Sequence, residues 1–332
     1  MSVWGVAMVR NEADIIEAFV RHNLTLLDGL TIVDHRSADA TLAILEALAR
    51  EGLPLRMLRS DSVAYAQQEV TSAAVRQTFA ATAADFVFPL DADEFVKTPS
   101  RAHLRRALAA LPPGGHGVMT WHTYLPDFAA PHRNVVASAR SARRLAEELF
   151  PHGKVVVSRH FVDTPRAVLT GGNHAVKPWS DAPASSWDLH YRFAPRDLAI
   201  AHLPYRSSVQ FVAKTVIKRL ARVAAGRDWS AAFDRREAYD DIAAGRPIDA
   251  AYLRAATVNL NVALDRRRDA ASVALVDDPF IADVVLRYTP PEPADALPLV
   301  IAAVEEFARR EAQARSGQAT NPTPATAHPR AP

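Results

Sequence analysis

The sequence predicts an α/β protein built on a parallel β-sheet with helices on both faces. Residues 3–9, 30–35 and 86–90 are short runs that are apolar along nearly their whole length. The segments between them place apolar residues at the three- and four-residue spacing of helices. Strands that are apolar on both sides are typical of a parallel sheet that is buried on both faces.

The elements of the first hundred residues alternate regularly between strand and helix. A predicted helix ends where Gly52 follows its last periodic residue. The predicted order is strand 3–9, helix 13–27, strand 30–35, helix 38–52, strand 53–60, helix 66–84 and strand 86–90. This order is that of a Rossmann-like, nucleotide-binding half.

The pattern changes after the Pro-Pro-Gly-Gly stretch at 112–115. Residues 116–128 and 154–162 read as strands, 140–150 as a short helix, and the chain from 209 onward as mainly helical. The last residues have the composition of a disordered tail. We therefore expect one domain over 1–208 with halves 1–111 and 112–208, a helical region over 209–315, and a tail over 316–332.

Composition excludes several classes of function. The chain has no cysteine, so disulfides, thiolate metal sites and cysteine nucleophiles are excluded, and any metal must bind Asp, Glu, His or water. The net charge of +2 gives no electrostatic reason to expect nucleic acid as a partner. No apolar run is long enough to span a membrane, and the first residues do not read as an export signal. We expect a soluble, cytoplasmic protein.

Charged side chains gather where the predicted strands end. Arg10, Asn11 and Glu12 follow the first strand, Asp34 and His35 end the second, and Asp91, Asp93 and Glu94 follow the strand at 86–90. A polar turn in water would explain any one of these clusters. Because the carboxyl ends of parallel strands share one edge, three clusters favour a ligand site there.

The Asp-Ala-Asp sequence at 91–93 suits a divalent cation. Two carboxylates at positions i and i+2 beyond a buried strand can bracket Mg²⁺ or Mn²⁺, and these ions keep coordination sites for phosphate oxygens. The tripeptide alone is common and often marks a solvated turn. Its place after three strand-helix units favours a nucleotide diphosphate as the ligand.

The segments "VAMVRNEADIIEAFVRHNL", "IVDHRSADATLAILEAL" and "ADFVFPLDADEFV" resemble a GT-A glycosyltransferase of the family 2-like bacterial group related to family 92. The resemblance covers roughly residues 3–220 and implies a GT-A fold with a mainly helical C-terminal extension. It also implies a metal-dependent hexosyltransferase-type enzyme of polysaccharide biosynthesis. Such an enzyme moves a sugar from a nucleotide-diphosphate donor to a hydroxyl, with inversion. The acceptor would be a carbohydrate or a lipid-linked molecule, which is compatible with peripheral contact with the inner membrane.

The same resemblance implies roles for individual residues. Asn11, Glu12 and Asp34 would line the nucleoside pocket, and Ser37, Asp39 and Thr41 would form the following turn and helix cap. Asp91 and Asp93 match the DxD motif that binds the metal and the sugar nucleotide, which makes Asp93 a catalytic residue, and His202 would supply a third contact to Mn²⁺ or Mg²⁺.

The catalytic base is not assigned by the resemblance, because residues 115–210 contain no Glu-Asp or Asp-Asp pair of the kind that supplies it in many family 2 enzymes. His174 and His202 each fall beside a predicted strand end. An imidazole can ligate a metal or accept a proton near neutral pH, although a single His is more often a satisfied polar residue. We assign His202 to the metal and His174 to the acceptor or base.

A basic helix and an aromatic stretch each leave two interpretations open. Lys214, Lys218 and Arg222 share one helix face in a segment that stays basic to Arg227. That face is either solvated or a cationic wall for a diphosphate or an anionic acceptor. Aromatic residues can stack on a sugar or fill the core. The aromatic residues concerned are Trp121, Tyr124 and Phe128.

Two other functions fit parts of the pattern. A haloacid-dehalogenase-like phosphatase also places Asp-x-Asp after an apolar strand, although its motif would normally come earlier in the chain. A catalytically inactive nucleotide-binding or polysaccharide-assembly module would keep the fold without turnover.

Overall fold

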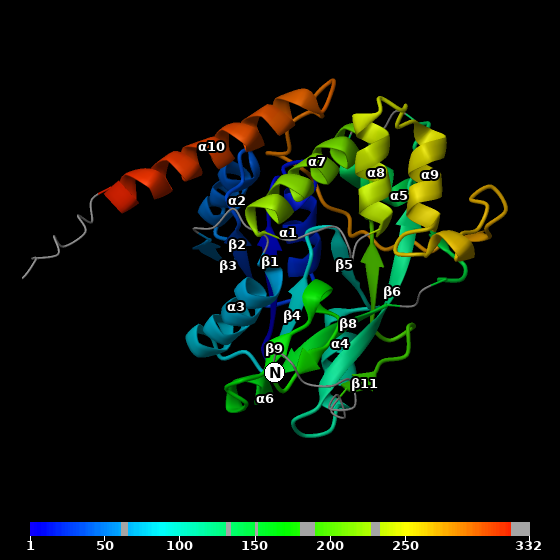
Figure 1. Cartoon of the computed structure of the whole chain (residues 1–332). Helices are drawn as coiled ribbons and strands as arrows, with labels where there is room; N and C mark the ends of the chain where they lie inside the picture. The colour runs from blue at the N-terminus through cyan, green and yellow to red at the C-terminus, as the bar shows by residue number, and fades with distance from the viewer. Residues whose placement is uncertain (61–65, 131–133, 150–151, 180–189, 227–232, 320–332) are drawn as a thin grey trace, which may run out of the picture.

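The computed structural model describes residues 1–60, 66–130, 134–149, 152–179, 190–226 and 233–319, and its first half is the expected parallel sheet (Figure 1). The strands lie side by side in the order β3-β2-β1-β4. Their bounds are β1 Val3–Val9, β2 Gly29–Asp34, β3 Leu55–Arg59 and β4 Phe86–Leu90. The connecting helices are α1 Ile16–Leu24, α2 Thr41–Arg50 and α3 Gln67–Ala81.

Alternate residues of these strands serve two separate cores. Ala7 of β1 packs in the cluster that contains Phe19 of α1 and Ile44 of α2. Its neighbour Val6 packs with Phe79 of α3 on the other face. Because successive side chains of a strand point to opposite faces, a run such as 3–9 must be apolar at nearly every position. The predicted α/β class is confirmed.

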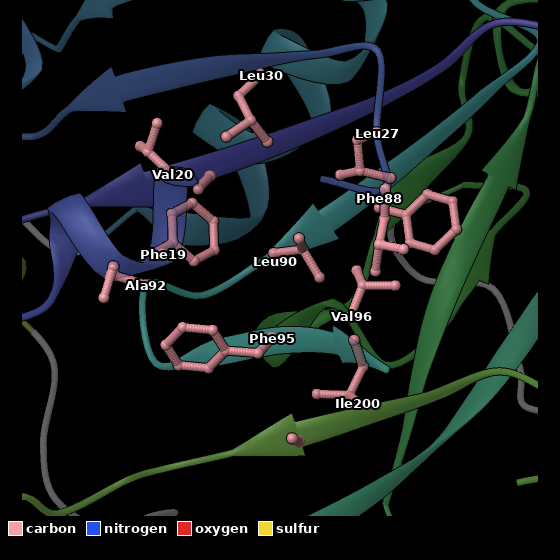
Figure 2. Packing of buried hydrophobic residues seen from close by; sticks show 14 of the residues in the cluster. Phe19, Val20, Leu27, Leu30, Phe88, Leu90, Ala92, Phe95, Val96 and Ile200 are labelled. Atoms are coloured by element: carbon pink, nitrogen blue, oxygen red, sulfur yellow. The ribbon is translucent and has the colours of Figure 1, made fainter. Parts of the chain in front are cut away.

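The main core continues into the second half of the chain (Figure 2). Phe19, Leu30 and Phe88 from the parallel half belong to the same cluster as Phe95 and Ile200, which lie on two later strands. These strands are β5 Glu94–Lys97 and β12 Ala199–His202, and they pair antiparallel, with Glu94 opposite His202. The cluster therefore joins both halves of the expected domain into one core.

Beyond β4 the sheet becomes mixed. β8, Gly153–Ser158, pairs antiparallel with β4 and with the long β6, His116–Leu125. β12 and β11, His190–Arg192, pair parallel with β6. The remaining elements here are α4 Arg101–Ala109, α5 Val135–Ser141, β7 Arg143–Leu145, α6 His160–Asp163, β9 Val168–Leu169, a 3-10 turn Gly171–Asn173 and β10 Val176–Lys177.

The helix expected over 140–150 is wrong. α5 ends at Ser141, and residues 143–145 form β7, which pairs with the end of β6 on one side and with β13, Leu275–Val276, on the other. Backbone hydrogen bonds to two partner strands outweigh the local helical spacing, because propensity over so few residues is a weak preference.

The C-terminal region is built mainly of helices. They are α7 Ser208–Ala224, α8 Phe233–Ala243, α9 Ala250–Val258 and α10 Leu297–Ala319, with a 3-10 turn at Leu264–Arg266. α7 and α10 pack on one another and lie across the end of the sheet remote from the N-terminus (Figure 1). α10 continues past residue 316, where the tail was expected to begin, and residues 320–332 lie outside the described part. No helix of the described residues is long and apolar enough to cross a membrane.

Residues 278–289, between β13 and α10, form a strap that crosses the N-terminal half. Asp278 forms ion pairs with Lys97 and Arg144, and Phe280 packs in the main core. The buried carboxylate of Glu17 on α1 accepts hydrogen bonds from three consecutive backbone amides, those of residues 287–289, at 2.8, 2.8 and 2.9 Å. The C-terminal region is thus anchored to the first helix of the chain.

Glu17→Gln should lower the free energy of unfolding by about 2–3 kcal/mol, because hydrogen bonds to a charged acceptor are lost and an amide N–H₂ would face backbone donors. Burial alone would raise the pKa of Glu17, but the hydrogen bonds from the strap and from Arg21 hold it below its ordinary value. Urea unfolding measures the effect. Glu46→Gln, which removes a surface carboxylate on α2, is the control. Equal stability of the two variants would contradict the anchoring role.

Candidate active site at the carboxyl edge of the sheet

A cavity of about 900 Å³ lies at the carboxyl ends of β1 and β4, below α7. Ligand cavities of small-molecule enzymes range over roughly 300–1,000 Å³, so this one is large enough for a nucleotide sugar. Most of the site residues predicted from the sequence line it: Asn11, Glu12, Asp91, Asp93, His174 and His202. Asp34 is buried at the end of β2 and is not part of the lining.

The loop after β1 is held in place by the segment after β2. The backbone amides of residues 11–13 donate in turn to the side chains of Ser37 at 3.1 Å, Thr41 at 2.8 Å and Asp39 at 3.1 Å. These polar residues therefore stabilise the loop that carries Glu12, and Thr41 is the first residue of α2. Within this loop Asn11 adopts a left-handed conformation, with φ +54°.

A buried lysine on β8, Lys154, binds Asp91. The Nζ atom of Lys154 donates to Asp91 Oδ2 at 3.0 Å and to Gly172 O at 2.9 Å, and it lies 2.7 Å from Glu94 Oε2. The second oxygen of Asp91 accepts from Gln67 Nε2 at 2.8 Å. Only 1% of the Lys154 side chain is exposed, and its ammonium is held by these three acceptors in place of water.

Burial and the nearby charges set the protonation states of Lys154 and Glu94. Burial lowers the pKa of Lys154, but attraction to Asp91 and Glu94 outweighs burial and the net pKa is raised. For Glu94 burial dominates and raises the pKa to about 8, against the opposing effect of Lys154. The lysine is therefore charged, and it is the counter-charge of Asp91.

A second lysine, from α7, binds Asp93. The Nζ atom of Lys214 lies 2.9 Å from Asp93 Oδ2 and 2.9 Å from Glu12 Oε1. Arg206 binds the other oxygen of Glu12 at 3.0 Å and reaches Asp14 at 2.6 Å. Burial would raise the pKa of Asp93, but the nearby cations, above all Lys214, hold it below its ordinary value. For Glu12 burial prevails, and its pKa is raised.

Histidine and tryptophan rings also line the cavity. The Trp121 ring lies 4.3 Å from that of His202, and His152 stacks on His174 at 4.6 Å, centroid to centroid. Nδ1 of His174 is 2.8 Å from the carbonyl of Gly153 and donates to it, which leaves Nε2 as the acceptor in the neutral ring. Of the other predicted aromatic residues, Tyr124 is fully buried and Phe128 packs near α7 and α9.

The donors fit a divalent cation in kind. Nδ1 of His202 has no hydrogen-bond partner in the described part of the chain, and Nε2 lies 3.7 Å from Asp93 Oδ1, which is too far for a hydrogen bond. Burial lowers the pKa of His202 to about 3, so the imidazole is neutral and can ligate. A carboxylate and a neutral imidazole suit Mn²⁺, and carboxylates suit Mg²⁺.

The metal set is not assembled in this arrangement. Within the described ranges no three His, Asp or Glu side chains are grouped so that they could hold a metal ion. Asp91 hydrogen-bonds to Gln67 and Lys154 through its two oxygens, and Asp93 is paired with Lys214. A cation at Asp93 would therefore compete with a lysine that is already bound there.

The basic face of α7 lines the cavity. Lys214, Lys218 and Arg222 all contribute to its wall, which excludes the interpretation that the face only meets bulk solvent. Arg227, the last member of the predicted basic segment, lies outside the described residues.

Lys154, Gln67 and Arg206 were not predicted as site residues. Lys154 had one sequence signal, since it precedes three consecutive valines in a predicted strand, where a charge needs a partner. Gln67 and Arg206 had no such signal, because their roles depend on acids 24 and 192 positions away in the chain.

No protein-family model and no curated protein matches the sequence. Among solved structures, the chain is similar to TarS 1–349 from S. aureus, at 13% identity over 80% of this chain and 76% of that chain, with a TM-score of 0.37. It is also similar to glucosyl-3-phosphoglycerate synthase from Mycobacterium tuberculosis, solved with Mn²⁺, UDP and glucosyl-3-phosphoglycerate, at 14% identity over 69% and 82% with a TM-score of 0.35. A third is a putative glucose-1-phosphate thymidylyltransferase from Bacillus anthracis in complex with sucrose, at 8% identity over 67% and 96% with a TM-score of 0.32. At these values the similarities establish no activity, so the function must be inferred from the site.

Proposed function

We propose that the chain is a GT-A glycosyltransferase that moves a sugar from a nucleotide-diphosphate donor to a hydroxyl group. The observation that carries the proposal is the Asp91 and Asp93 pair at the end of β4, in a parallel β3-β2-β1-β4 half, facing a cavity of about 900 Å³ with a cationic wall. Strand-end acids in such a sheet are placed to meet a ligand, and the basic face of α7 supplies charge for phosphates.

In this proposal each side of the cavity has one task. Lys214 and Lys218 attract the diphosphate, and Asp93 with His202 would hold Mn²⁺ or Mg²⁺, with Asp91 able to join after exchanging one of its partners. When bound, such an ion neutralises charge that develops on the departing diphosphate.

The proton of the acceptor hydroxyl goes to His174. Nε2 is its available atom, because Nδ1 donates to Gly153 O, and the Trp121 ring beside it offers a surface for a sugar. Burial lowers the pKa of His174, so the ring is neutral and able to accept at neutral pH. Attack by the acceptor oxygen from the face opposite the diphosphate inverts the anomeric carbon. The acceptor is a carbohydrate or a lipid-linked molecule.

The test is a panel of UDP-, GDP- and dTDP-sugars, with and without Mn²⁺, scored first by thermal stabilisation and then by release of nucleoside diphosphate in the presence of hydroxyl acceptors. The proposal expects one donor class to bind and to be cleaved. A phosphatase would instead release inorganic phosphate from phosphate monoesters. An inactive module would bind a donor without turnover, and either result would overturn the proposal.

A further inference from the structure

The two lysines of the site differ in how firmly they are held. Lys154 is 1% exposed and has three acceptors, whereas the Lys214 side chain is 35% exposed and lines the cavity. Lys214 lies on a flexible four-carbon chain and forms its two ion pairs at the cavity wall. It can therefore exchange its partners without unpacking the core, which Lys154 cannot do.

Lys214 occupies an oxygen of Asp93 that a metal would need. It binds Oδ2 at 2.9 Å, while Oδ1 lies 3.7 Å from Nε2 of His202, whose Nδ1 has no hydrogen-bond partner among the described residues. A divalent ion placed between Asp93 and His202 would be repelled by an ammonium only a few ångströms away.

A bound phosphate group would offer the Lys214 ammonium an alternative anionic partner. Lys218 and Arg222 follow at four-residue intervals on the same face of α7 and line the same cavity. A diphosphate that reached this row would meet Lys214 as well, because its partly exposed side chain lines the same cavity. Charge-assisted bonds to phosphate would replace those to Asp93 and Glu12.

We propose that Lys214 is an exchangeable cation, which neutralises Asp93 and Glu12 before ligands bind and passes to the donor diphosphate when a divalent ion takes its place at Asp93. This inference rests on the proposed function. It makes the binding of metal and of nucleotide mutually supportive, because each removes an obstacle to the other.

The first test measures Mn²⁺ affinity of Lys214→Gln without nucleotide, by the electron paramagnetic resonance signal of free Mn²⁺. We expect Mn²⁺ to bind about tenfold more tightly than to the unmodified protein, because the competing ammonium is gone. UDP affinity without metal, measured by calorimetry, should fall about tenfold, because a phosphate partner is lost. Weaker or unchanged Mn²⁺ binding in a folded variant would overturn the proposal.

Lys218→Gln is the matched control. It removes a cation from the same wall, one turn away, and should weaken UDP binding while leaving Mn²⁺ affinity without nucleotide unchanged. An equal gain in Mn²⁺ affinity in both variants would show a general effect of charge and not an exchange at Asp93. Circular dichroism and thermal melts of both variants establish that they are folded.

A second measurement on the unmodified protein covers the case in which Lys214→Gln does not fold. Saturating UDP should raise Mn²⁺ affinity about tenfold or more, and equal affinities with and without UDP would contradict the exchange. If the unmodified protein binds neither Mn²⁺ nor any nucleotide of the panel, the proposed function itself fails. If it binds both without coupling, only the exchange fails.

Discussion

Asp93→Asn is expected to lower the rate of the proposed sugar transfer by about a hundredfold or more, because it removes a preorganised charge from the proposed reacting centre. Asp93 is buried at the cavity wall, where it binds Lys214 and faces His202. The amide keeps the shape of the side chain but can neither balance the ammonium nor bind a divalent ion strongly. Release of nucleoside diphosphate with the best donor measures the effect.

The fold should survive this substitution, since Glu12 still pairs with Lys214. Asp85→Asn is the matched control, because Asp85 precedes the same strand β4 at its opposite end and its side chain is 52% exposed. That variant should transfer sugar at the normal rate. Near-normal turnover by a well-folded Asp93→Asn variant would remove Asp93 from the site.

Lys154→Met should cost about 3–5 kcal/mol of folding stability, because removal of one partner from a buried ion pair leaves an uncompensated charge. The Asp91 carboxylate loses its counter-charge, the Glu94 side chain loses its contact with the ammonium, and the carbonyl of Gly172 loses a donor. Gly172 belongs to the turn that lines the cavity beside His174 and has φ +73°. Because this turn loses its hydrogen bond from Lys154, it should loosen as well. Urea unfolding gives the stability, and Lys177→Met, on β10, is the control.

The loss of folding stability in Lys154→Met should depend on pH, and the electrostatics of Glu94 give the direction. Burial raises the pKa of Glu94 to about 8 even beside Lys154, and loss of the lysine raises it further. A carboxyl whose pKa is higher in the folded than in the unfolded state favours folding at pH values below its unfolded pKa. That contribution is lost as the pH rises through the folded pKa. The destabilisation by Lys154→Met should therefore be larger at about pH 8.5 than at about pH 5.5. The reverse order would show that Glu94 is not the group left without its counter-charge.

The sequence by itself determined the parallel half of the fold and the place of the acids. Apolar runs such as 86–90 can be stable only where both faces of a strand are covered, and this requirement is met by α1 and α2 on one face and α3 on the other. The carboxyl ends of such strands share one edge, so the order of strands and helices is enough to predict that Glu12, Asp91 and Asp93 meet. The local patterns of strand and helix carried this information.

Only the tertiary structure decided which cations meet these acids. Lys154 reaches Asp91 across 63 positions of sequence and Lys214 reaches Asp93 across 121, through pairings of β8 and packing of α7 that no local pattern encodes. The same reason explains why residues 143–145 form a strand where helical spacing was read, and why Glu17 binds a strap 270 residues away. The free energy of a strand pair or a buried ion pair belongs to both partners. The sequence around one residue predicts that a strand or a buried charge requires a partner, and only the tertiary fold determines which residue that partner is.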